Sequence, residues 1–207
     1  NCPPIAIKTR ASNRLIASAR PPNTDCLMAR TATVFKAELS IANMDLHYYE
    51  THPLVLAQHP SETDERMMVR LLAFALNAHE QLQFTKGLST DDEPELWQKS
   101  LSDEIEVWIE LGQPDEKRIR KACGRAKQVI IYCYGGRSTE VWWSQINTHL
   151  QRFDNLRIVN LPKESCEAMT SMVQRTMQLN ISMQDGEVSI SDHQHNIDII
   201  PETLFPS

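Results

Sequence analysis

Long apolar segments are absent from this 207-residue sequence, and so is any pair of cysteines with CxxC spacing. No run approaches the roughly 18 apolar residues of a membrane-spanning helix, so we expect no membrane segment. An odd number of cysteines without that spacing argues against a disulfide framework or a zinc site, and favours reduced thiols in a cytoplasmic protein. The five cysteines are Cys2, Cys26, Cys123, Cys133 and Cys166.

Acidic residues are nearly missing from residues 1–27, which hold four basic residues, one acidic residue and no apolar periodicity. We predict a disordered extension there. Two origins stay open: translated sequence upstream of a start at Met28, or a targeting peptide. The remaining 28–207 segment has 17 basic and 26 acidic residues, a net charge of −9. A body this acidic is not a general nucleic-acid-coating protein.

The rest of the composition, 41% hydrophobic with 6% aromatic residues, suits a single globular domain over residues 28–207. Alternating apolar residues predict strands at 33–41 and 105–111, and a return strand at 46–57. Asp185-Gly186 between two short alternating segments predicts a C-terminal hairpin. Residues 129–134 and 156–161 are typical of buried strands.

Four segments carry helical patterns. The clearest runs over residues 62–84, with Ser61 as the expected N-cap. The others are a helix after Pro114, with Ile119, Ala122, Cys123 and Ala126 inward, and helices over 138–153 and 164–177. Together the patterns predict an α/β (α+β) fold, with a mixed central β-sheet flanked by helices and β-hairpins added at both ends.

The most informative stretch begins with the acidic turn DDEPELW (91–97), which precedes a strand. A second strand ends in Glu110, which shares a face with Glu106 and Trp108. Two carboxylates at neighbouring strand ends suit Mg²⁺, which takes oxygen ligands and keeps several waters. Glu65 lies at the margin of the first helix's apolar face, where it is either part of such a site or a first-turn dipole residue.

A basic segment follows these acids. Residues 114–137 contain seven basic and two acidic residues, out of character with the acidic body. They form either a phosphate-contact surface or an ordinary solvated face, and composition does not decide between the two. The basic residues are Lys117, Arg118, Arg120, Lys121, Arg125, Lys127 and Arg137.

Several motifs closely resemble the YaeQ family of small bacterial proteins: HPSETDERMM (59–68), GLSTDDEPELW (87–97), IELGQPDEKRIRKAC (109–123) and the Trp142-Trp143 pair. The resemblance covers residues 28–207. It implies a variant of the PD-(D/E)XK, restriction-endonuclease-like core, in which a helix, a three-stranded meander, a helix and a further strand follow one another.

By the same resemblance, Asp92, Glu110 and either Glu62 or Glu65 would hold Mg²⁺ or Mn²⁺, which activates water and stabilises the leaving oxygen. The motif's lysine position is Gly112 in this chain, so a replacement must come from the next helix. Lys121 is where the YaeQ motif places its basic residue, and Lys117 is the other candidate. A helical wheel places both away from the buried stripe.

Two functions follow as hypotheses. The first is a Mg²⁺-dependent phosphodiesterase acting on nucleic acid, with Arg118, Arg125 and Arg137 as backbone contacts and DNA or RNA left open. The second is a catalytically inactive binding or regulatory protein with a protein partner, motivated by Gly112. In either case we expect a monomer or weak dimer.

Overall fold

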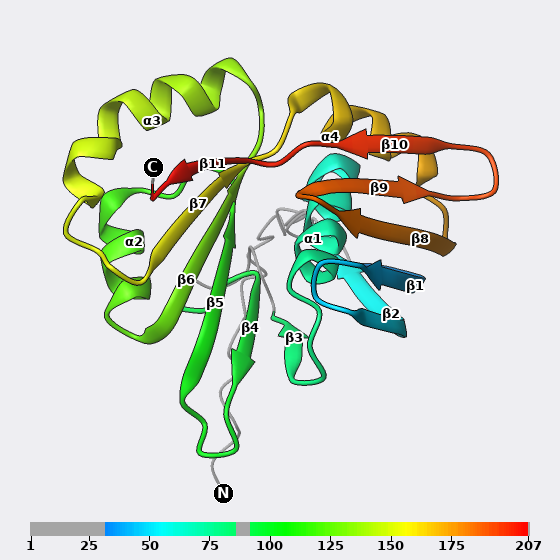
Figure 1. Cartoon of the computed structure of the whole chain (residues 1–207), viewed down its shortest axis with the longest axis horizontal. Helices are drawn as coiled ribbons and strands as arrows, with labels where there is room; N and C mark the ends of the chain where they lie inside the picture. Colours follow the sequence, from blue (N-terminus) through cyan, green and yellow to red (C-terminus); the bar gives the residue numbers. More distant parts are fainter. Residues whose placement is uncertain (1–31, 86–91, 207) are drawn as a thin grey trace, which may run out of the picture. The chain divides into compact units, whose positions relative to one another are not determined.

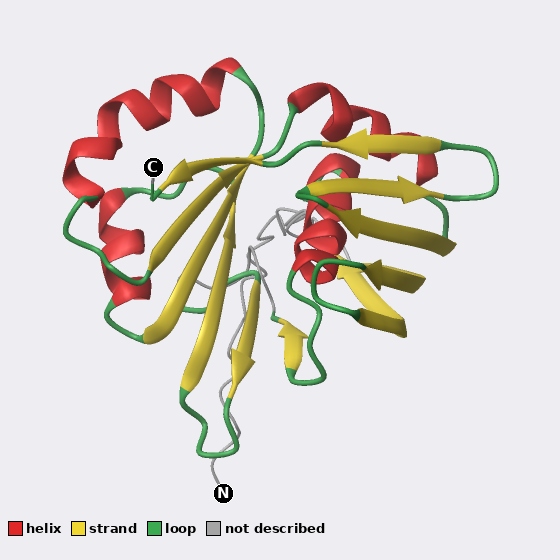
Figure 2. Cartoon of the chain, in the orientation of Figure 1, coloured by secondary structure: helices red, strands yellow, loops and turns green. Residues whose placement is uncertain are grey.

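Two mixed β-sheets, rather than one central sheet, organise the part of the chain that the structure describes, residues 32–85 and 92–206 of a computed structural model (Figures 1 and 2). The five-stranded sheet has the order β10-β9-β8-β1-β2. Its strands are β1 (Thr33–Asn43), β2 (Tyr48–Gln58), β8 (Thr176–Gln184), β9 (Glu187–Ser191) and β10 (Asn196–Ile199). Because β1 pairs in parallel with β8, the predicted N-terminal and C-terminal hairpins form one sheet.

The six-stranded sheet has the order β11-β7-β6-β5-β4-β3. The first three of these strands in sequence form an antiparallel meander, and the next two continue the sheet in parallel. The strands are β3 (Leu82–Phe84), β4 (Leu96–Lys99), β5 (Ile105–Leu111), β6 (Ala126–Cys133), β7 (Leu156–Asn160) and β11 (Glu202–Phe205).

Helices separate and cover the sheets. Helix α1 (Asp64–Leu76) lies between them, and its buried residues belong to one apolar core with residues from both sheets (Figure 1). Helix α4 (Lys163–Met169), followed by a 3₁₀ turn (Thr170–Met172), adds to that core. A second core joins the opposite face of the six-stranded sheet to α2 (Glu116–Cys123) and α3 (Arg137–Leu150). Among the described residues no helix has the length and apolarity needed to span a membrane.

The α+β class and most periodic elements are confirmed, with boundaries that differ by a few residues. The burial of β1 alternates along its length, as expected of a strand with one face in a core. The hairpin between β8 and β9 turns at Asp185 and Gly186, whose φ angles of 53° and 81° are those of a two-residue hairpin turn.

The predicted helix over residues 62–84 is wrong at both ends. Thr63, not Ser61, is the N-cap, and its side chain accepts a hydrogen bond from the Arg66 amide at 3.2 Å. Ser61 instead bonds the His59 ring at 2.6 Å. At the other end Asn77 Nδ2 donates to the Ala73 carbonyl at 2.8 Å, which closes the last turn, and the chain continues into β3.

Two further boundaries are corrected. The helix predicted over residues 164–177 ends at Met169, and its last predicted residue, Met177, lies in β8. Ala126, predicted to face inward from a helix, is the first residue of β6. The predicted extension over residues 1–27 lies outside the described residues.

Leu72 on α1 is fully buried between the sheets, so Leu72→Ala should lower the free energy of unfolding by about 2–5 kcal/mol. Urea unfolding followed by circular dichroism measures this. Leu101→Ala is the matched control, because Leu101 is 98% exposed and its truncation creates no cavity. Equal losses in the two variants would contradict the placement of α1 in the core.

Candidate functional site

The candidate site lies where β5 ends and β4 begins. Glu95 directly precedes β4, and its amide donates to the carbonyl of Ile109 at 3.0 Å. Leu96 pairs with Ile109 in the antiparallel ladder, and continuing that register sets Glu95 opposite Glu110. Two acidic residues from adjacent strands therefore lie at one end of the sheet, and their side chains bond arginines on helices that cover opposite faces of it, Arg66 of α1 and Arg118 of α2.

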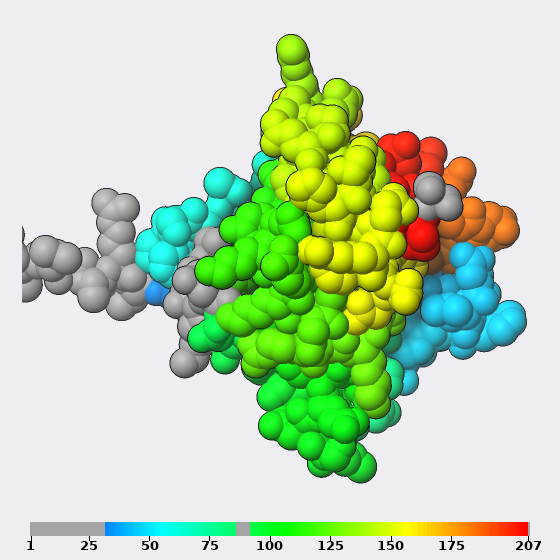
Figure 3. Space-filling view, turned by 90° about the vertical axis from the view of Figure 1, so that its left-hand side faces the viewer, coloured from blue at the N-terminus to red at the C-terminus, as the bar shows by residue number. Residues whose placement is uncertain are grey.

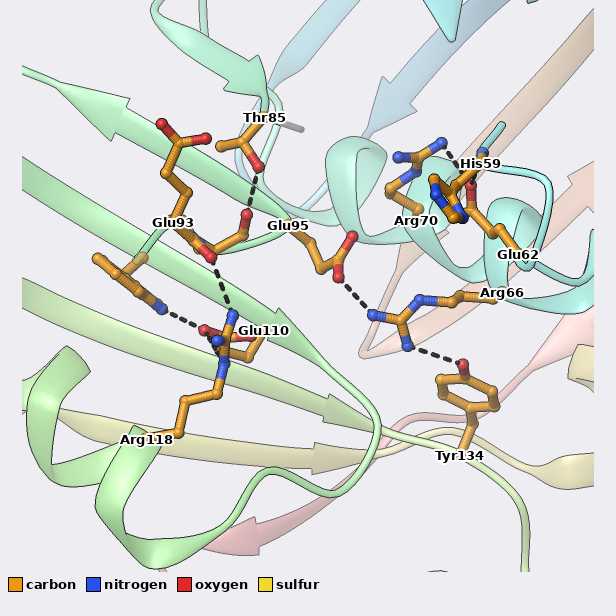
Figure 4. A network of polar contacts seen from close by, with 12 residues as sticks. His59, Glu62, Arg66, Arg70, Thr85, Glu93, Glu95, Glu110, Arg118 and Tyr134 are labelled. Carbon is orange, nitrogen blue, oxygen red and sulfur yellow. Dashed lines mark hydrogen bonds and ion pairs between the residues drawn. The ribbon is translucent and has the colours of Figure 1, made fainter. Parts of the chain in front are cut away.

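Glu110 is 4% exposed and is held by two donors. Trp108 Nε1 donates to its Oε1 at 2.7 Å, and Arg118 Nε donates to the same oxygen at 2.9 Å (Figure 4). The predicted common face of Trp108 and Glu110 is thereby confirmed. Burial raises the pKa of Glu110 above its ordinary value against the opposing effect of Arg118, and the nearby charge of Glu95 adds to the rise.

Glu95 is 3% exposed and forms an ion pair with Arg66 of α1 (Figure 4). Its second oxygen, Oε2, is buried and has no hydrogen-bond partner among the residues that the structure describes. Arg66 Nη1 lies 3.4 Å from the Tyr134 hydroxyl, and 3.8 Å from the place that a Cβ on Gly112 would occupy. The guanidinium thus fills the space beside the residue that stands at the motif's lysine position.

Glu62 is the third buried acid, and it sits just before α1. Its Oε2 accepts from Arg70 Nη2 at 3.1 Å, while its Oε1 is buried without a partner in the described part of the chain. Burial is the main cause of its raised pKa; Arg70 opposes this, and the charge of Glu95 adds to it. Glu95 therefore acts electrostatically on the acids on both sides of it, and each acid is held by one arginine. The three pairs are Glu62–Arg70, Glu95–Arg66 and Glu110–Arg118.

Asp92 was predicted to share a metal site with Glu110, but the contacts of its side chain and carbonyl are with α2 and the residues just after it. It is exposed, its carboxylate pairs with Lys121, and its carbonyl accepts from Arg125 Nη1 at 2.9 Å. The hydrogen bond and charge of Lys121 lower the pKa of Asp92. The structure thus joins Asp92 to α2, whereas the acid that perturbs Glu110 is Glu95.

Helices α2 and α3 belong to the green-to-yellow part of the chain, which faces the viewer in Figure 3. Lys117, Arg118 and Lys121 line a pocket of about 290 Å³ together with Asp115, whose side chain caps α2. Arg118 Nη2 also donates to the Glu93 carbonyl at 2.9 Å. The exposed side of α2 predicted by the helical wheel is therefore the side that contacts the acidic segment.

Of the remaining predicted site residues, Arg125 borders the site, whereas Glu65 and Arg137 lie away from it. Glu65 faces α4: burial is the main cause of its raised pKa, and its charged neighbours there are Glu167 and Lys163. Arg125 packs over the Trp108 ring at 5.4 Å, and Arg137 is the exposed first residue of α3.

A family model described as "YaeQ protein" matches residues 28–201 of the chain. The chain belongs to the YaeQ family. An uncharacterised YaeQ protein of Escherichia coli K12 is 43% identical over 172 residues, which are 83% of this chain and 95% of that protein. A Salmonella typhi relative has the same identity and coverage.

Two solved YaeQ structures are similar to this one. The Xanthomonas axonopodis pv. citri protein gives a TM-score of 0.82 at 48% identity, covering 84% of this chain and 98% of that one. The Pseudomonas syringae protein gives 0.81 at 34% identity, covering 85% and 97%. The resemblance predicted from sequence motifs is confirmed at the level of the family.

Sequence reasoning about this YaeQ chain missed Glu95 and Arg66. The signal for Glu95 was its place immediately before Leu96, where β4 starts, but the neighbouring acids of the same turn obscured it. Nothing in the sequence indicated that Arg66 would reach across to β4. Within residues 32–85 and 92–206, no group of three or more His, Cys, Asp or Glu side chains is arranged to hold a metal ion.

Arg66→Met should destabilise the YaeQ fold by about 3–5 kcal/mol, because it leaves the buried Glu95 carboxylate without its cation. The double variant Arg66→Met/Glu95→Gln should regain most of that loss, since it removes the charge as well. Urea unfolding at pH 7 measures both. Asp103→Asn, in an exposed pair with Lys99, should leave stability nearly unchanged. The single variant Glu95→Gln completes the comparison. If the stability losses of Arg66→Met and Glu95→Gln simply add in the double variant, the pairing is contradicted.

Ionisation of Glu110 should lower the free energy of unfolding as the pH rises. Its folded-state pKa is raised above the ordinary 4.5, so the folded state binds the proton more tightly than the unfolded state does. The stabilising contribution is therefore complete below the ordinary pKa and is lost as the pH rises through the raised value. Glu110→Gln cannot titrate, so its stability relative to the wild-type protein should improve between about pH 4 and pH 8. A pH-independent difference in urea unfolding would refute the shift.

Proposed function

We propose that this YaeQ protein is a metal-dependent phosphodiesterase acting on nucleic acid, built on a PD-(D/E)XK-like core. The observation that carries the proposal is the strand register, which sets residue 95 opposite residue 110 where β4 meets β5, together with the electrostatic effect of Glu95 on Glu110. Both are almost fully buried, and the charge of one raises the pKa of the other. A buried acid with a raised pKa beside a basic pocket, as Glu110 is, is typical of functional sites.

The order of elements supports the same core. Helix α1 precedes the β3-β4-β5 meander, and α2 then leads to β6, which is parallel to β5. This is the order that the family resemblance implies for a restriction-endonuclease-like core. Fold alone does not assign an activity, so the proposal depends on the side chains at the strand ends.

In this proposal Glu95 and Glu110 would be the protein ligands of a hard divalent cation. Mg²⁺ is usually bound by one or two carboxylates together with waters and substrate oxygens, and Glu95 and Glu110 supply two carboxylates. The buried Oε2 of Glu95 is an acceptor without a partner, which is the kind of atom that such a cation would satisfy. When bound, Mg²⁺ or Mn²⁺ supplies an activated water and neutralises charge on the leaving oxygen.

Arg66 takes the place of the motif's lysine in this proposal. Its Nη1 lies beside Gly112, where a longer side chain would otherwise project. A guanidinium stays protonated at all working pH values, so Arg66 would bind phosphate oxygens and stabilise developing negative charge, without acting as a base.

The basic face of α2 would bind the phosphate backbone. Lys117, Arg118 and Lys121 line one pocket beside Glu110, and multiple donors of this kind suit phosphate oxygens. Asp92 would position Lys121 through their ion pair.

A binding or regulatory protein without chemistry is the second candidate. Its favouring observation is that each buried acid of the site is already held by an arginine, which supplies the positive charge that a metal would otherwise bring. In that case α2 would still bind nucleic acid, while Glu95 and Glu110 would act only in folding.

Calorimetric titration with Mn²⁺ and a cleavage assay on single- and double-stranded DNA and RNA separate the two candidates. Wild-type protein should bind Mn²⁺ and cleave at least one substrate. Glu95→Gln and Glu110→Gln should each lose cleavage by about a hundredfold or more, because a ligand is removed while shape is kept. Glu106→Gln is the matched control on β5, since Glu106 pairs with Lys127 away from the site.

Asp92→Asn distinguishes the two assignments of the first acid. If Glu95 is the ligand, Asp92→Asn keeps Mn²⁺ binding. Loss of Mn²⁺ binding in Asp92→Asn but not in Glu95→Gln would overturn the use of Glu95. Salt-dependent nucleic-acid binding without Mn²⁺ binding or cleavage would favour the second candidate, and no nucleic-acid binding at all would reject both.

A further inference from the structure

A second site is indicated by a cavity of about 380 Å³ between the two sheets, at the end of α1 opposite the acidic site. Apolar side chains from three elements line it, including Leu76 of α1, Val159 of β7 and Met183 of β8. The polar side chains that line it include Tyr132 of β6 and Arg157 of β7. The lining is thus mixed, with apolar and polar side chains in comparable measure, and the volume lies in the range of small-molecule sites.

The Tyr132 hydroxyl has a proton to donate. Asn77 Nδ2 donates to this hydroxyl at 2.7 Å and to the Ala73 carbonyl at 2.8 Å, so both amide hydrogens of Asn77 are used. Tyr132 therefore accepts from Asn77, and its own hydrogen has no acceptor among the described residues. Burial raises the pKa of Tyr132 to about 12, so the group remains a donor at neutral pH. A residue only 5% exposed seldom leaves such a donor unused.

Arg157 is an unusual residue for its position. Its neighbours Leu156 and Ile158 face the core under α2 and α3, so Arg157 faces the opposite side of the sheet, as Val159 does. Within the described part of the chain it forms no ion pair or side-chain hydrogen bond, although it lines the cavity. Its charge is close enough to oppose the effect of burial on Tyr132. Two donors without acceptors thus meet in one cavity.

The acids that line the cavity do not neutralise Arg157. Asp45 accepts the backbone amides of Asp185 and Gly186 at 2.9 and 3.4 Å, in the turn between β8 and β9. Glu187 is exposed and forms no ion pair with Arg157. Arg157 is exposed and can be hydrated, whereas the buried Tyr132 hydroxyl lacks an acceptor among the described residues; an acceptor with negative charge would serve both donors.

We propose that this cavity binds a small carboxylate with an apolar body. The carboxylate would accept from the Tyr132 hydroxyl and the Arg157 guanidinium, and the apolar body would pack against Leu76, Val159 and Met183. This site shares no residue with the pairs around Glu95 and Glu110, so it does not depend on the proposed phosphodiesterase activity.

Titration of the full chain with sodium hexanoate, followed by ¹H–¹⁵N spectra, tests the proposal. The amides of residues 76–77, 132 and 157 should shift in a saturable way. Tyr132→Phe should weaken hexanoate binding by about tenfold or more, since it removes a hydrogen bond to a charged group while keeping the ring. Arg157→Met should weaken it at least as much, and Arg157→Lys should restore part of the affinity.

Two controls test whether hexanoate binds at this cavity and whether binding requires the carboxylate. Arg137→Met removes a guanidinium that does not line the cavity, so it should leave hexanoate binding unchanged. Hexan-1-ol, which lacks the carboxylate, should bind more weakly than hexanoate. The proposal is overturned by the absence of saturable shifts, by unchanged affinity in Arg157→Met, or by inorganic phosphate binding more tightly than hexanoate. Arg157 is exposed, so its variants remain informative if Tyr132→Phe fails to fold.

Discussion

Neutralisation of buried carboxylates by arginine is the constraint on which the rest of this structure depends. An ionised side chain out of water costs several kcal/mol unless an opposite charge meets it. Helix α1 supplies Arg66 and Arg70 one turn apart, and they serve acids in different places. Arg70 pairs with Glu62 just before the helix, whereas Arg66 crosses to Glu95 at the start of β4. Charge pairing thus joins α1 to the six-stranded sheet in addition to apolar packing.

The pairs between these arginines and carboxylates also limit the chemistry that is possible at the candidate site. A carboxylate already bonded to a guanidinium is satisfied, so it becomes a ligand only when the arginine moves. A phosphodiester offers arginine the acceptor geometry that a carboxylate offers. Under the proposed function, Arg66 and Arg118 therefore exchange carboxylate oxygens for phosphate oxygens, and the acids become available as the substrate binds. In this proposal the arginines take part in the mechanism. The lack of a side chain at Gly112 leaves space in which the Arg66 guanidinium can move.

Features that depend on neighbouring residues could be predicted from the sequence. The alternation of β1 and β5 indicated strands with one buried face, and the common face of Trp108 and Glu110 followed from the period of a strand. The end of α1 was missed because a side-chain cap at Asn77, rather than a loss of apolar pattern, terminates the helix. A long apolar pattern continued past that cap in the sequence and was mistaken for more helix.

Contacts between distant segments were not predictable in this way. The parallel pairing of β1 with β8 joins residues about 140 positions apart, and no local pattern specifies it. Asp92 and Glu95 occupy one acidic turn with similar chemistry, and only the register of β4 against β5 distinguishes them. In the sequence, Arg157 is an ordinary surface residue of a short strand. Only the structure shows that it lines a cavity.

The two ends of α1 are fixed to the same face of β6, and this limits how the acidic site can open. Near its start, Arg66 meets the Tyr134 hydroxyl; just past its end, Asn77 bonds the Tyr132 hydroxyl. Tyr132 lies in β6 and Tyr134 directly follows its last residue, so the two tyrosines hold the helix at two points at this end of the strand. A rigid shift of α1 would break both contacts and disturb a core shared by both sheets. Under the proposed function, Glu95 would therefore be released by rotation of the long Arg66 side chain, with the helix in place.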